Sequence, residues 1–284
     1  MPMPSGTKFE AFRDTYNLIR KQKDGLANTT VVLSEGDSWF AFPLDNFNLL
    51  DVVTTLVPGL YLRLEDNGDE AVQMFRKDGR NLDRIGDHLK HFDFDAVLIS
   101  AGGNDIVGEH LQGVFAGQKT LTPAAAVELV KAARFDIVRQ SYQNLIDVVR
   151  KKGNGKVPIL AHTYDYPVRL GVPAELDLKG IGLIALLVSK VGDWIGSYVK
   201  AVIPQKADQL EFVRLLLDAF RDDILVPLQR ANADIFRFCP LLGTLGPDPT
   251  LWHDELHPSD AGFQQLGEKF AAQLKTLLAT FTPP

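Results

Sequence analysis

Short apolar runs alternate with longer amphipathic stretches along the chain. Five runs rich in Val, Ile, Leu or Phe end in small or polar residues, at positions 30–34, 60–65, 96–100, 157–162 and 234–238. Each is apolar at successive positions rather than at alternate ones, which is typical of parallel strands buried between two layers of helices. The pattern therefore predicts an α/β fold built on a five-stranded parallel sheet.

Helical periodicity fills most of the intervals between these runs. Phe9, Phe12, Tyr16 and Ile19 recur at spacings of three and four, which predicts an amphipathic helix before the first strand. Pro123 suits the first turn of a long helix that ends near residue 152. A last helix is marked by apolar residues at helical spacing, with Ser259 placed to cap it: Phe263, Leu266, Phe270, Leu274, Leu277 and Phe281.

The interval 166–230 is longer than a crossover between two parallel strands requires. Its stretch 181–202 is strongly apolar, but Lys190, Asp193 and Lys200 interrupt it, which argues against a membrane span. We interpret 166–230 as a helical insertion between the fourth and fifth strands. It could add to the core, cover an apolar substrate site as a lid, or form a dimer face.

Composition and charge limit the possible partners. The 284 residues carry a net charge of −6 without a cluster of Lys and Arg, which argues against nucleic acid as the main partner. Cys239 is the single cysteine, so an intrachain disulfide is impossible, and we expect it to be a buried strand residue. The first residues have neither a basic patch nor an apolar run, so a cytoplasmic protein is expected. No linker or repeat divides the chain, which favours one domain over residues 1–284.

The first candidate for chemistry is Ser38, in the run Gly36-Asp37-Ser38-Trp39 directly after the first strand. A serine in a tight turn at the carboxyl end of a strand presents its hydroxyl to the crevice where open α/β sheets bind ligands. Gly36 would permit a sharp change of backbone direction. A serine at this position is equally typical of an ordinary helix cap.

Two further turns follow the second and third strands. Asn104, in Gly102-Gly103-Asn104-Asp105, carries an amide that can donate a hydrogen bond to an oxyanion. Gly68, in Asn67-Gly68-Asp69, could offer its backbone N–H to the same oxyanion. Both motifs are also common as turns without any function.

Among the six histidines, only His257 has a carboxylate three residues earlier, at Asp254. A serine nucleophile needs a base that takes its proton and an acid that orients the base. A competing interpretation pairs His253 with His257 as zinc ligands four residues apart on a helix. Asp254 stands where that motif requires Glu, and Pro258 disfavours helical geometry at His257.

Taken in order, these motifs resemble those of the SGNH, or GDSL-type, hydrolases: Gly36-Asp37-Ser38, Gly68, Gly102-x-Asn104-Asp105 and Asp254-x-x-His257-Pro258. The resemblance implies a flavodoxin-like three-layer α/β/α sandwich and esterase or lipase chemistry. It makes Ser38 the nucleophile, His257 the base and Asp254 its orienting acid. The oxyanion hole would consist of the Ser38 N–H, the Gly68 N–H and the Asn104 side chain.

Two departures from the family pattern stand out. Trp39 replaces the leucine of the family name, and Asp69-Glu70 replaces the small run often found after the glycine. The long interval 166–230 also prevents a substrate from being carried over from the family.

The expected reaction is hydrolysis of an acyl ester through an acyl-enzyme, with no metal or organic cofactor. Aromatic residues after two strands could line the substrate pocket or simply pack the sheet edge: Trp39, Phe40, Tyr164 and Tyr166. The expected partner is a small-molecule acyl ester, and a homo-oligomer is also compatible with the sequence. Alternatives are acyl transfer to an alcohol or sugar, and a non-catalytic protein that binds lipid or carbohydrate.

Overall fold

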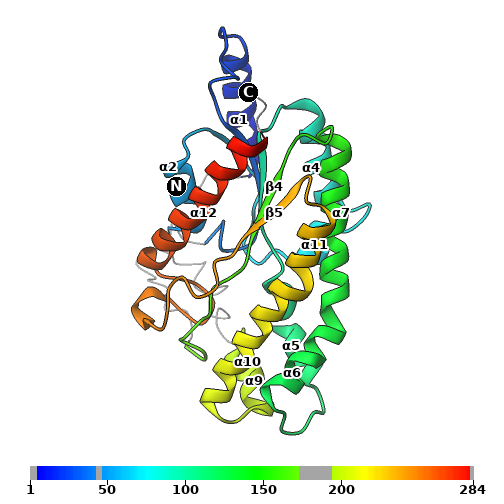
Figure 1. The fold of residues 1–284 in the computed structure, drawn as a ribbon, viewed down its shortest axis with the longest axis vertical. Helices are drawn as coiled ribbons and strands as arrows, with labels where there is room; N and C mark the ends of the chain where they lie inside the picture. The colour runs from blue at the N-terminus through cyan, green and yellow to red at the C-terminus, as the bar shows by residue number, and fades with distance from the viewer. Residues whose placement is uncertain (1–4, 43–46, 173–193, 282–284) are drawn as a thin grey trace.

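A five-stranded parallel sheet with the strand order β2-β1-β3-β4-β5 forms the centre of the protein (Figure 1). The computed structural model describes residues 5–42, 47–172 and 194–281. The strands are β1 (Val31–Gly36), β2 (Leu60–Arg63), β3 (Ala96–Ser100), β4 (Ile159–His162) and β5 (Phe236–Cys239). All five predicted strands are present, and their bounds differ from the predicted ones by two residues at most.

Burial explains why the strands are apolar at successive positions. Every residue of β1, β3 and β4 is buried, because helices cover both faces of the sheet. The central register pairs Val32 with Ala96 and Val97 with Ile159. The sheet thereby aligns the carboxyl ends of its strands along one edge, where ligands of open α/β sheets bind.

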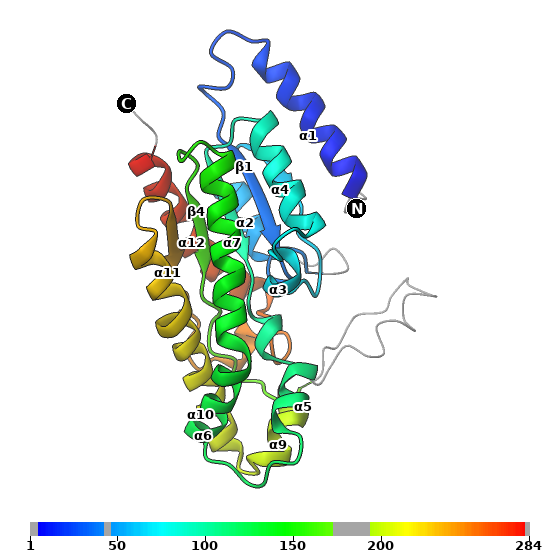
Figure 2. The ribbon, with the colours of Figure 1, turned by 90° about the vertical axis from the view of Figure 1, so that its right-hand side faces the viewer.

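Two helix layers enclose the sheet, so the predicted three-layer α/β/α sandwich is confirmed. One layer contains α2 (Leu49–Leu56) and α12 (Asp260–Phe281), and the other contains α4 (Arg80–His91), α7 (Asp136–Lys152) and α11 (Val226–Ala231). The helix α1 (Ser5–Arg20) contacts the edge strand β2, and Figure 2 shows it beside α4. The α2–α12 contact is close: a Cβ atom on Gly267 would lie 2.4 Å from Cβ of Val52.

Two long helical stretches each contain a π-helical segment. The predicted helix from Pro123 consists of α6 (Pro123–Val130), the π-helix η2 (Lys131–Phe135) and α7. The second stretch consists of α10 (Lys206–Ala219), the π-helix η3 (Phe220–Leu225) and α11. Lys131 and Asp223 join the two π-helices through an ion pair of 2.9 Å.

Several helices gather beyond the carboxyl ends of the strands. They are α5 (Glu109–Phe115), α6, α9 (Gly196–Val202) and α10, at the end of the molecule to which β1 points (Figure 2). Here α9, α10, η3 and α11 are the helices within the described part of the predicted insertion 166–230 between β4 and β5. Positions 181–193 of its apolar stretch lie outside the described residues. Among the helices that the structure describes, none has the length and apolarity needed to span a bilayer.

Two local predictions are confirmed. Cys239 is buried at the end of β5, and burial raises the pKa of its thiol to about 12. The Ser259 hydroxyl caps α12 by accepting a hydrogen bond from the N–H of Gly262 at 3.4 Å. The Ser259 cap fixes the start of α12, and with it the end of the loop that precedes the helix.

Candidate active site

Ser38 and His257 meet at the carboxyl edge of the sheet. The Ser38 hydroxyl Oγ lies 2.8 Å from Nε2 of His257, and both residues are buried, with 7% and 5% of their surfaces exposed. With the imidazole proton on Nδ1, Nε2 is free to accept the hydrogen of the hydroxyl. This is the geometry in which a base can take a proton from a serine nucleophile.

The opposite side of the His257 ring is held by Asp254. Nδ1 of His257 lies 2.8 Å and 3.0 Å from the two carboxylate oxygens of this fully buried residue. The backbone N–H groups of Leu256 and His257 donate to Oδ1 at 2.7 Å and 2.8 Å. Burial raises the pKa of Asp254, but the hydrogen bonds from His253 and His257 outweigh burial and hold this pKa below its usual range. The carboxylate is therefore ionised and can stabilise an imidazolium.

Asp37 builds the turn that presents Ser38. Its buried carboxylate accepts hydrogen bonds from the Trp39 N–H at 3.0 Å, from the Ser100 hydroxyl at 2.7 Å and from the Tyr164 hydroxyl. Its carbonyl oxygen accepts from the N–H of Phe40 at 3.0 Å. Burial raises the pKa of Asp37, and the hydrogen bonds oppose that shift. The turn is thus fixed from β3 and from the segment after β4 as well as from β1.

Gly36 is required for a different reason from the one that the sequence suggested. Its φ angle is not in the left-handed region. A Cβ atom at this position would lie 2.5 Å from the carbonyl oxygen of Ser100 on β3. The glycine therefore allows close approach of two strands rather than a sharp change of backbone direction.

Asn104 stands beside Ser38 at the end of β3, at the start of η1 (Asn104–Ile106). Gly102 has a φ of +97° and Gly103 contacts the Tyr164 ring so closely that a Cβ atom would lie 2.7 Å from it. Nδ2 of Asn104 donates one hydrogen bond, of 2.9 Å, to the carbonyl oxygen of Asp69. An amide nitrogen carries two hydrogens, so the second is available for a ligand in the pocket.

Asp105 ties the Asn104 turn to its surroundings. Its buried carboxylate accepts from the N–H groups of Ala71 and Val72 at 2.7 Å and 3.1 Å, at the start of α3 (Ala71–Met74). Its carbonyl oxygen accepts from the guanidinium of Arg134 in η2 at 2.7 Å. Burial raises the pKa of Asp105 to about 6. These bonds hold η1 against two separate helices.

The structure does not place Gly68 among the residues that line the pocket around Ser38. Its φ of +83° explains the glycine, because a side chain there would be strained. Gly68 is connected to the pocket through its neighbour Asp69, whose carbonyl oxygen accepts a hydrogen bond from the Asn104 side chain. Burial, followed by repulsion from Asp66 and Asp37, raises the pKa of the Asp69 carboxyl to about 6.

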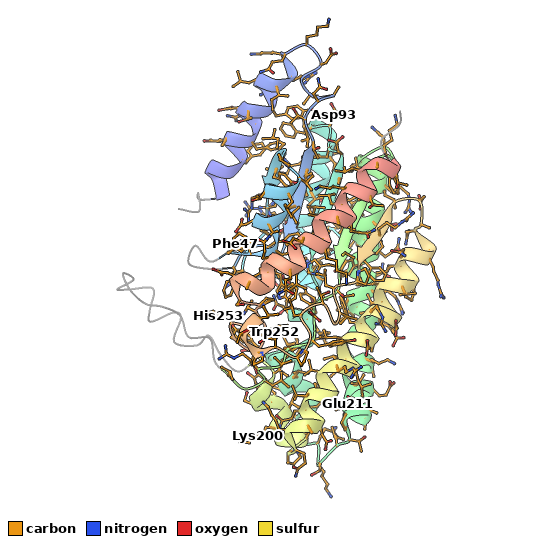
Figure 3. The ribbon with its side chains drawn as sticks, turned by 60° about the vertical axis from the view of Figure 1, so that its left-hand side comes forward. Phe47, Asp93, Lys200, Glu211, Trp252 and His253 are labelled. Atoms are coloured by element: carbon orange, nitrogen blue, oxygen red, sulfur yellow. The ribbon has the colours of Figure 1, made fainter. Side chains whose placement is uncertain are left out.

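The segment with His253 and His257 is a loop and not a helical turn. An antiparallel bridge joins Trp252 to Pro258, and the His253 N–H donates to the His257 carbonyl at 2.8 Å. Figure 3 shows Trp252 and His253 below the first turn of α12. Nδ1 of His253 also contacts Asp254, at 3.3 Å, and this hydrogen bond raises the pKa of His253. Over residues 5–42, 47–172 and 194–281, no three His, Cys, Asp or Glu side chains group as metal ligands.

A pocket with about 440 Å³ of empty volume, partly open to solvent, lies over Ser38. Its lining includes the polar groups of Ser38, His257 and Asn104. It also includes a set of aliphatic side chains, here called the aliphatic wall: Val107, Ile195, Val213, Leu217 and Leu256. Asp37 and Asp165 line the pocket too, but their carboxylates accept hydrogen bonds within the protein. Among the described lining residues there is no Lys or Arg to pair with an anionic ligand, and the aliphatic wall offers an apolar surface.

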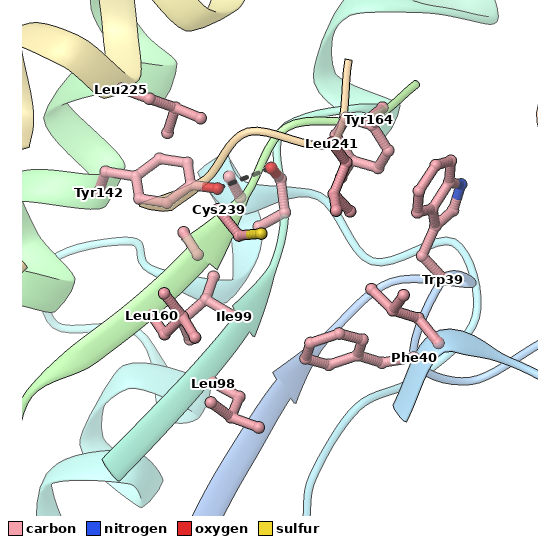
Figure 4. Packing of buried hydrophobic residues seen from close by; sticks show 14 of the residues in the cluster. Trp39, Phe40, Leu98, Ile99, Tyr142, Leu160, Tyr164, Leu225, Cys239 and Leu241 are labelled. Carbon is pink, nitrogen blue, oxygen red and sulfur yellow. Dashed lines mark hydrogen bonds between the residues drawn. The ribbon is translucent and has the colours of Figure 1, made fainter. Parts of the chain in front are cut away.

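Of the four aromatic residues expected at the pocket, the structure places two there. Trp39 and Tyr164 line it, with their rings edge to face at 5.0 Å (Figure 4). Phe40 instead is fully buried in the core, where its ring lies 5.9 Å from that of Phe270. Tyr166 is half-buried, and its hydroxyl donates to Asp218 at 2.7 Å. Phe40 and Tyr166 are thus structural, because the chain after each strand turns them away from Ser38.

The sequence did not single out the aliphatic wall. Val213 and Leu217 come from α10, and Ile195 from the residue before α9. The signals in the sequence were the length of the interval 166–230 and the apolarity of its stretch 181–202, which includes Ile195 but neither Val213 nor Leu217. Phe42 packs against the His257 ring, with 4.4 Å between the ring centroids.

No family model and no curated protein matches the sequence. Solved structures do match the fold. An extracellular lipase from Streptomyces rimosus is similar over 89% of this chain and 100% of its own, with a TM-score of 0.51 and 15% identity. A carbohydrate esterase of family 3 from Talaromyces cellulolyticus is similar over 89% and 100%, with a TM-score of 0.49 and 11% identity. Other similar structures are described as SGNH hydrolases and GDSL-like lipases. The likeness to the Streptomyces rimosus lipase shows a shared fold, in agreement with the three-layer α/β/α sandwich described above.

Proposed function

We propose that the protein is a serine esterase of the SGNH type that hydrolyses neutral esters with an apolar acyl group. The observation that carries the proposal is the unbroken hydrogen-bonded series from Ser38 through His257 to the ionised Asp254, which opens into a pocket shared with Asn104. The fold of the similar structures agrees with this chemistry.

In the first step, Ser38 Oγ attacks the ester carbonyl while His257 Nε2 accepts the hydroxyl proton. Asp254 holds the imidazole in the tautomer that leaves Nε2 unprotonated, and then stabilises the imidazolium. The negative charge of the tetrahedral intermediate is stabilised by the second N–H of Asn104 and by the Ser38 backbone N–H. Gly68 is a third donor in this proposal if its turn approaches the pocket when substrate binds.

The first half of the reaction ends when His257 protonates the leaving alcohol, the bond from the carbonyl carbon to that alcohol breaks, and the acyl group remains on Ser38. In the second half, water attacks the acyl-enzyme, with His257 again as the base. The proton that His257 takes from water returns to Ser38 Oγ as the acid leaves. The acyl group packs against the aliphatic wall of Val213, Leu217 and Ile195. The reaction requires no metal, so activity should survive exhaustive chelation.

The experiment is a panel of p-nitrophenyl esters of rising acyl length, measured on the wild type and on Ser38→Ala. Ser38→Ala should abolish turnover, and a fluorophosphonate should label Ser38 in the wild type. Ser141→Ala is a matched control, because that buried serine lies on α7 and its hydroxyl bonds only to the Ile137 carbonyl. Unchanged turnover in Ser38→Ala would overturn the proposal. Partition of the acyl group to an added alcohol would instead identify acyl transfer.

A further inference from the structure

In the sequence, Glu255 lies between Asp254 and His257 of the proposed triad, and its side chain is buried. Its side chain accepts four backbone hydrogen bonds and has no exposed surface. Oε1 accepts from the N–H groups of Trp194 and Ile195, at 2.6 Å and 2.9 Å. Oε2 accepts from those of Gly171 and Gly196, at 2.7 Å and 3.0 Å. A buried carboxylate is costly unless such donors satisfy it, so this arrangement must be well formed.

The four donors come from two stretches that are distant in sequence. Gly171 lies after β4, whereas residues 194–196 lead into α9. The stretches are in direct contact, because a Cβ atom on Gly196 would lie 2.6 Å from Cα of Gly171. Glu255 therefore joins both stretches to the loop that carries Asp254 and His257.

This junction places two side chains at the reacting groups. The Trp194 ring meets the His257 imidazole edge to face, with 5.4 Å between centroids and 80° between planes. The next residue, Ile195, lines the same pocket as Ser38. The Trp194 carbonyl also accepts from the Gly108 N–H at 2.6 Å. The His257 ring thus contacts two aromatic rings, that of Trp194 and that of Phe42, whose centroid lies 4.4 Å from its own.

We propose that Glu255 is a positioning residue that holds Trp194 against His257 and Ile195 in the pocket wall. The inference rests on the proposed esterase function. Glu255 does not touch the reacting atoms and acts through the backbone of residues 194–196. A purely structural role would lower stability without selectively changing the kinetics.

The test is Glu255→Gln in the full chain, assayed with p-nitrophenyl esters. The amide nitrogen of glutamine would face two backbone N–H donors and cannot accept from them. Two of the four hydrogen bonds that join residue 255 to Gly171 and residues 194–196 would therefore be lost. We expect kcat to fall by about tenfold to a hundredfold, because small displacements of a catalytic group are costly. Thr163→Val is the matched control: the fully buried Thr163 hydroxyl accepts from the N–H groups of Leu241 and Leu242, at 2.8 Å and 3.2 Å. The control should lower the melting temperature but keep kcat.

A double-mutant cycle with Trp194→Ala separates positioning from general destabilisation. If Glu255 acts through Trp194, the effects on kcat will be strongly non-additive, whereas additive effects would overturn the proposal. Equal losses of kcat in Glu255→Gln and Thr163→Val at equal losses of melting temperature would also overturn it. If Glu255→Gln does not fold, Trp194→Ala and Ile195→Ala decide, and wild-type kinetics in both would refute the role.

Failure of the proposed function is distinguishable from failure of this inference. If the wild type neither hydrolyses the esters nor reacts with a fluorophosphonate at Ser38, the esterase proposal fails. The surroundings of Trp194 are then measured by fluorescence. Subtracting the emission spectrum of Trp194→Phe from that of the wild type isolates the emission of Trp194 from that of the other two tryptophans. That difference should change in a Glu255→Gln background, and an unchanged difference would show that Glu255 does not position the ring.

Discussion

Ser38 Oγ lies 2.8 Å from His257 Nε2, although 219 residues separate them in the sequence. Ser38 follows the first strand of the sheet, and His257 precedes the last helix. The contact therefore depends on the parallel sheet and on the docking of α12 against α2, whose closeness Gly267 permits. Local turn chemistry alone could not produce it.

Asp254→Asn should lower kcat by about four orders of magnitude, because an amide favours the wrong imidazole tautomer while it keeps the shape of the carboxylate. The second histidine on this carboxylate provides a matched control. His253→Ala should change kcat less than about threefold: it removes a 3.3 Å hydrogen bond to Asp254 and a ring contact with Phe42, but the bonds from Asp254 to His257 and to two backbone N–H groups remain. Ester hydrolysis by both variants, with circular dichroism to verify folding, measures the difference. Similar losses in the two variants would contradict the assignment of His257 as the base.

Asn104→Ala should reduce kcat about a hundredfold with little change in KM, because an oxyanion donor acts mainly in the transition state. Asn144→Ala is the control, since the Asn144 amide donates to the Phe75 carbonyl at 3.1 Å, away from the pocket. Steady-state kinetics on one good ester are sufficient. An effect of Asn104→Ala confined to KM would exclude the oxyanion role. The lost bond to Asp69 should appear separately, as a small drop in melting temperature.

Leu217→Ala should extend the range of acyl chains that are hydrolysed, and Leu217→Phe should shorten it. The side chain forms part of the aliphatic wall, so its size limits the space beyond Ser38. Each added methylene that the pocket accepts is worth about 1 kcal/mol in kcat/KM. Leu215→Ala on the same helix is the control, because Leu215 is half-buried and does not line the pocket. The same profile of kcat/KM against acyl length in Leu217→Ala and in the control would refute this function of the wall.

Glu35→Gln should flatten the dependence of stability on pH. Burial raises the pKa of Glu35 from 4.5 to about 8, and this exceeds the opposing effect of Arg84. Between these two values the folded protein keeps a proton that the unfolded chain has lost, so stability falls as pH rises. The loss is about 1.4 kcal/mol per pH unit across that window. Thermal melts at pH 5 to 9 should therefore show a smaller decline in Glu35→Gln than in the wild type.

The exposed Glu128 offers a control for that series, because Glu128→Gln leaves every buried carboxylate in place. Its pH profile should follow that of the wild type. Parallel profiles for Glu35→Gln and the wild type would mean that Glu35 does not cause the loss of stability with rising pH.

The sequence predicted the strands and the layers, and it singled out Ser38, Asn104, Asp254 and His257 of the candidate site, because each has a local signature. Ser38, Asn104 and Asp254 follow strands or precede a helix, and parallel strands bring their carboxyl ends to one edge. Phe40 was misplaced because the direction of a side chain after a strand depends on a tertiary turn, which Asp37 fixes from three sides. Glu255 could not be found at all, since its partners are backbone N–H groups and any residue type can provide them.

The π-helix η3 has a consequence for how the pocket can change. It separates α10, which carries Val213 and Leu217, from α11, which packs near β5. Deleting one residue from Phe220–Leu225 would restore a regular helix and turn α10 relative to α11 by about 100°. Val213 and Leu217 would then turn away from the pocket, while the sheet, Ser38 and His257 stayed in place. A change of one residue in length is thus a route by which such a protein could acquire a new substrate range without altering its chemistry.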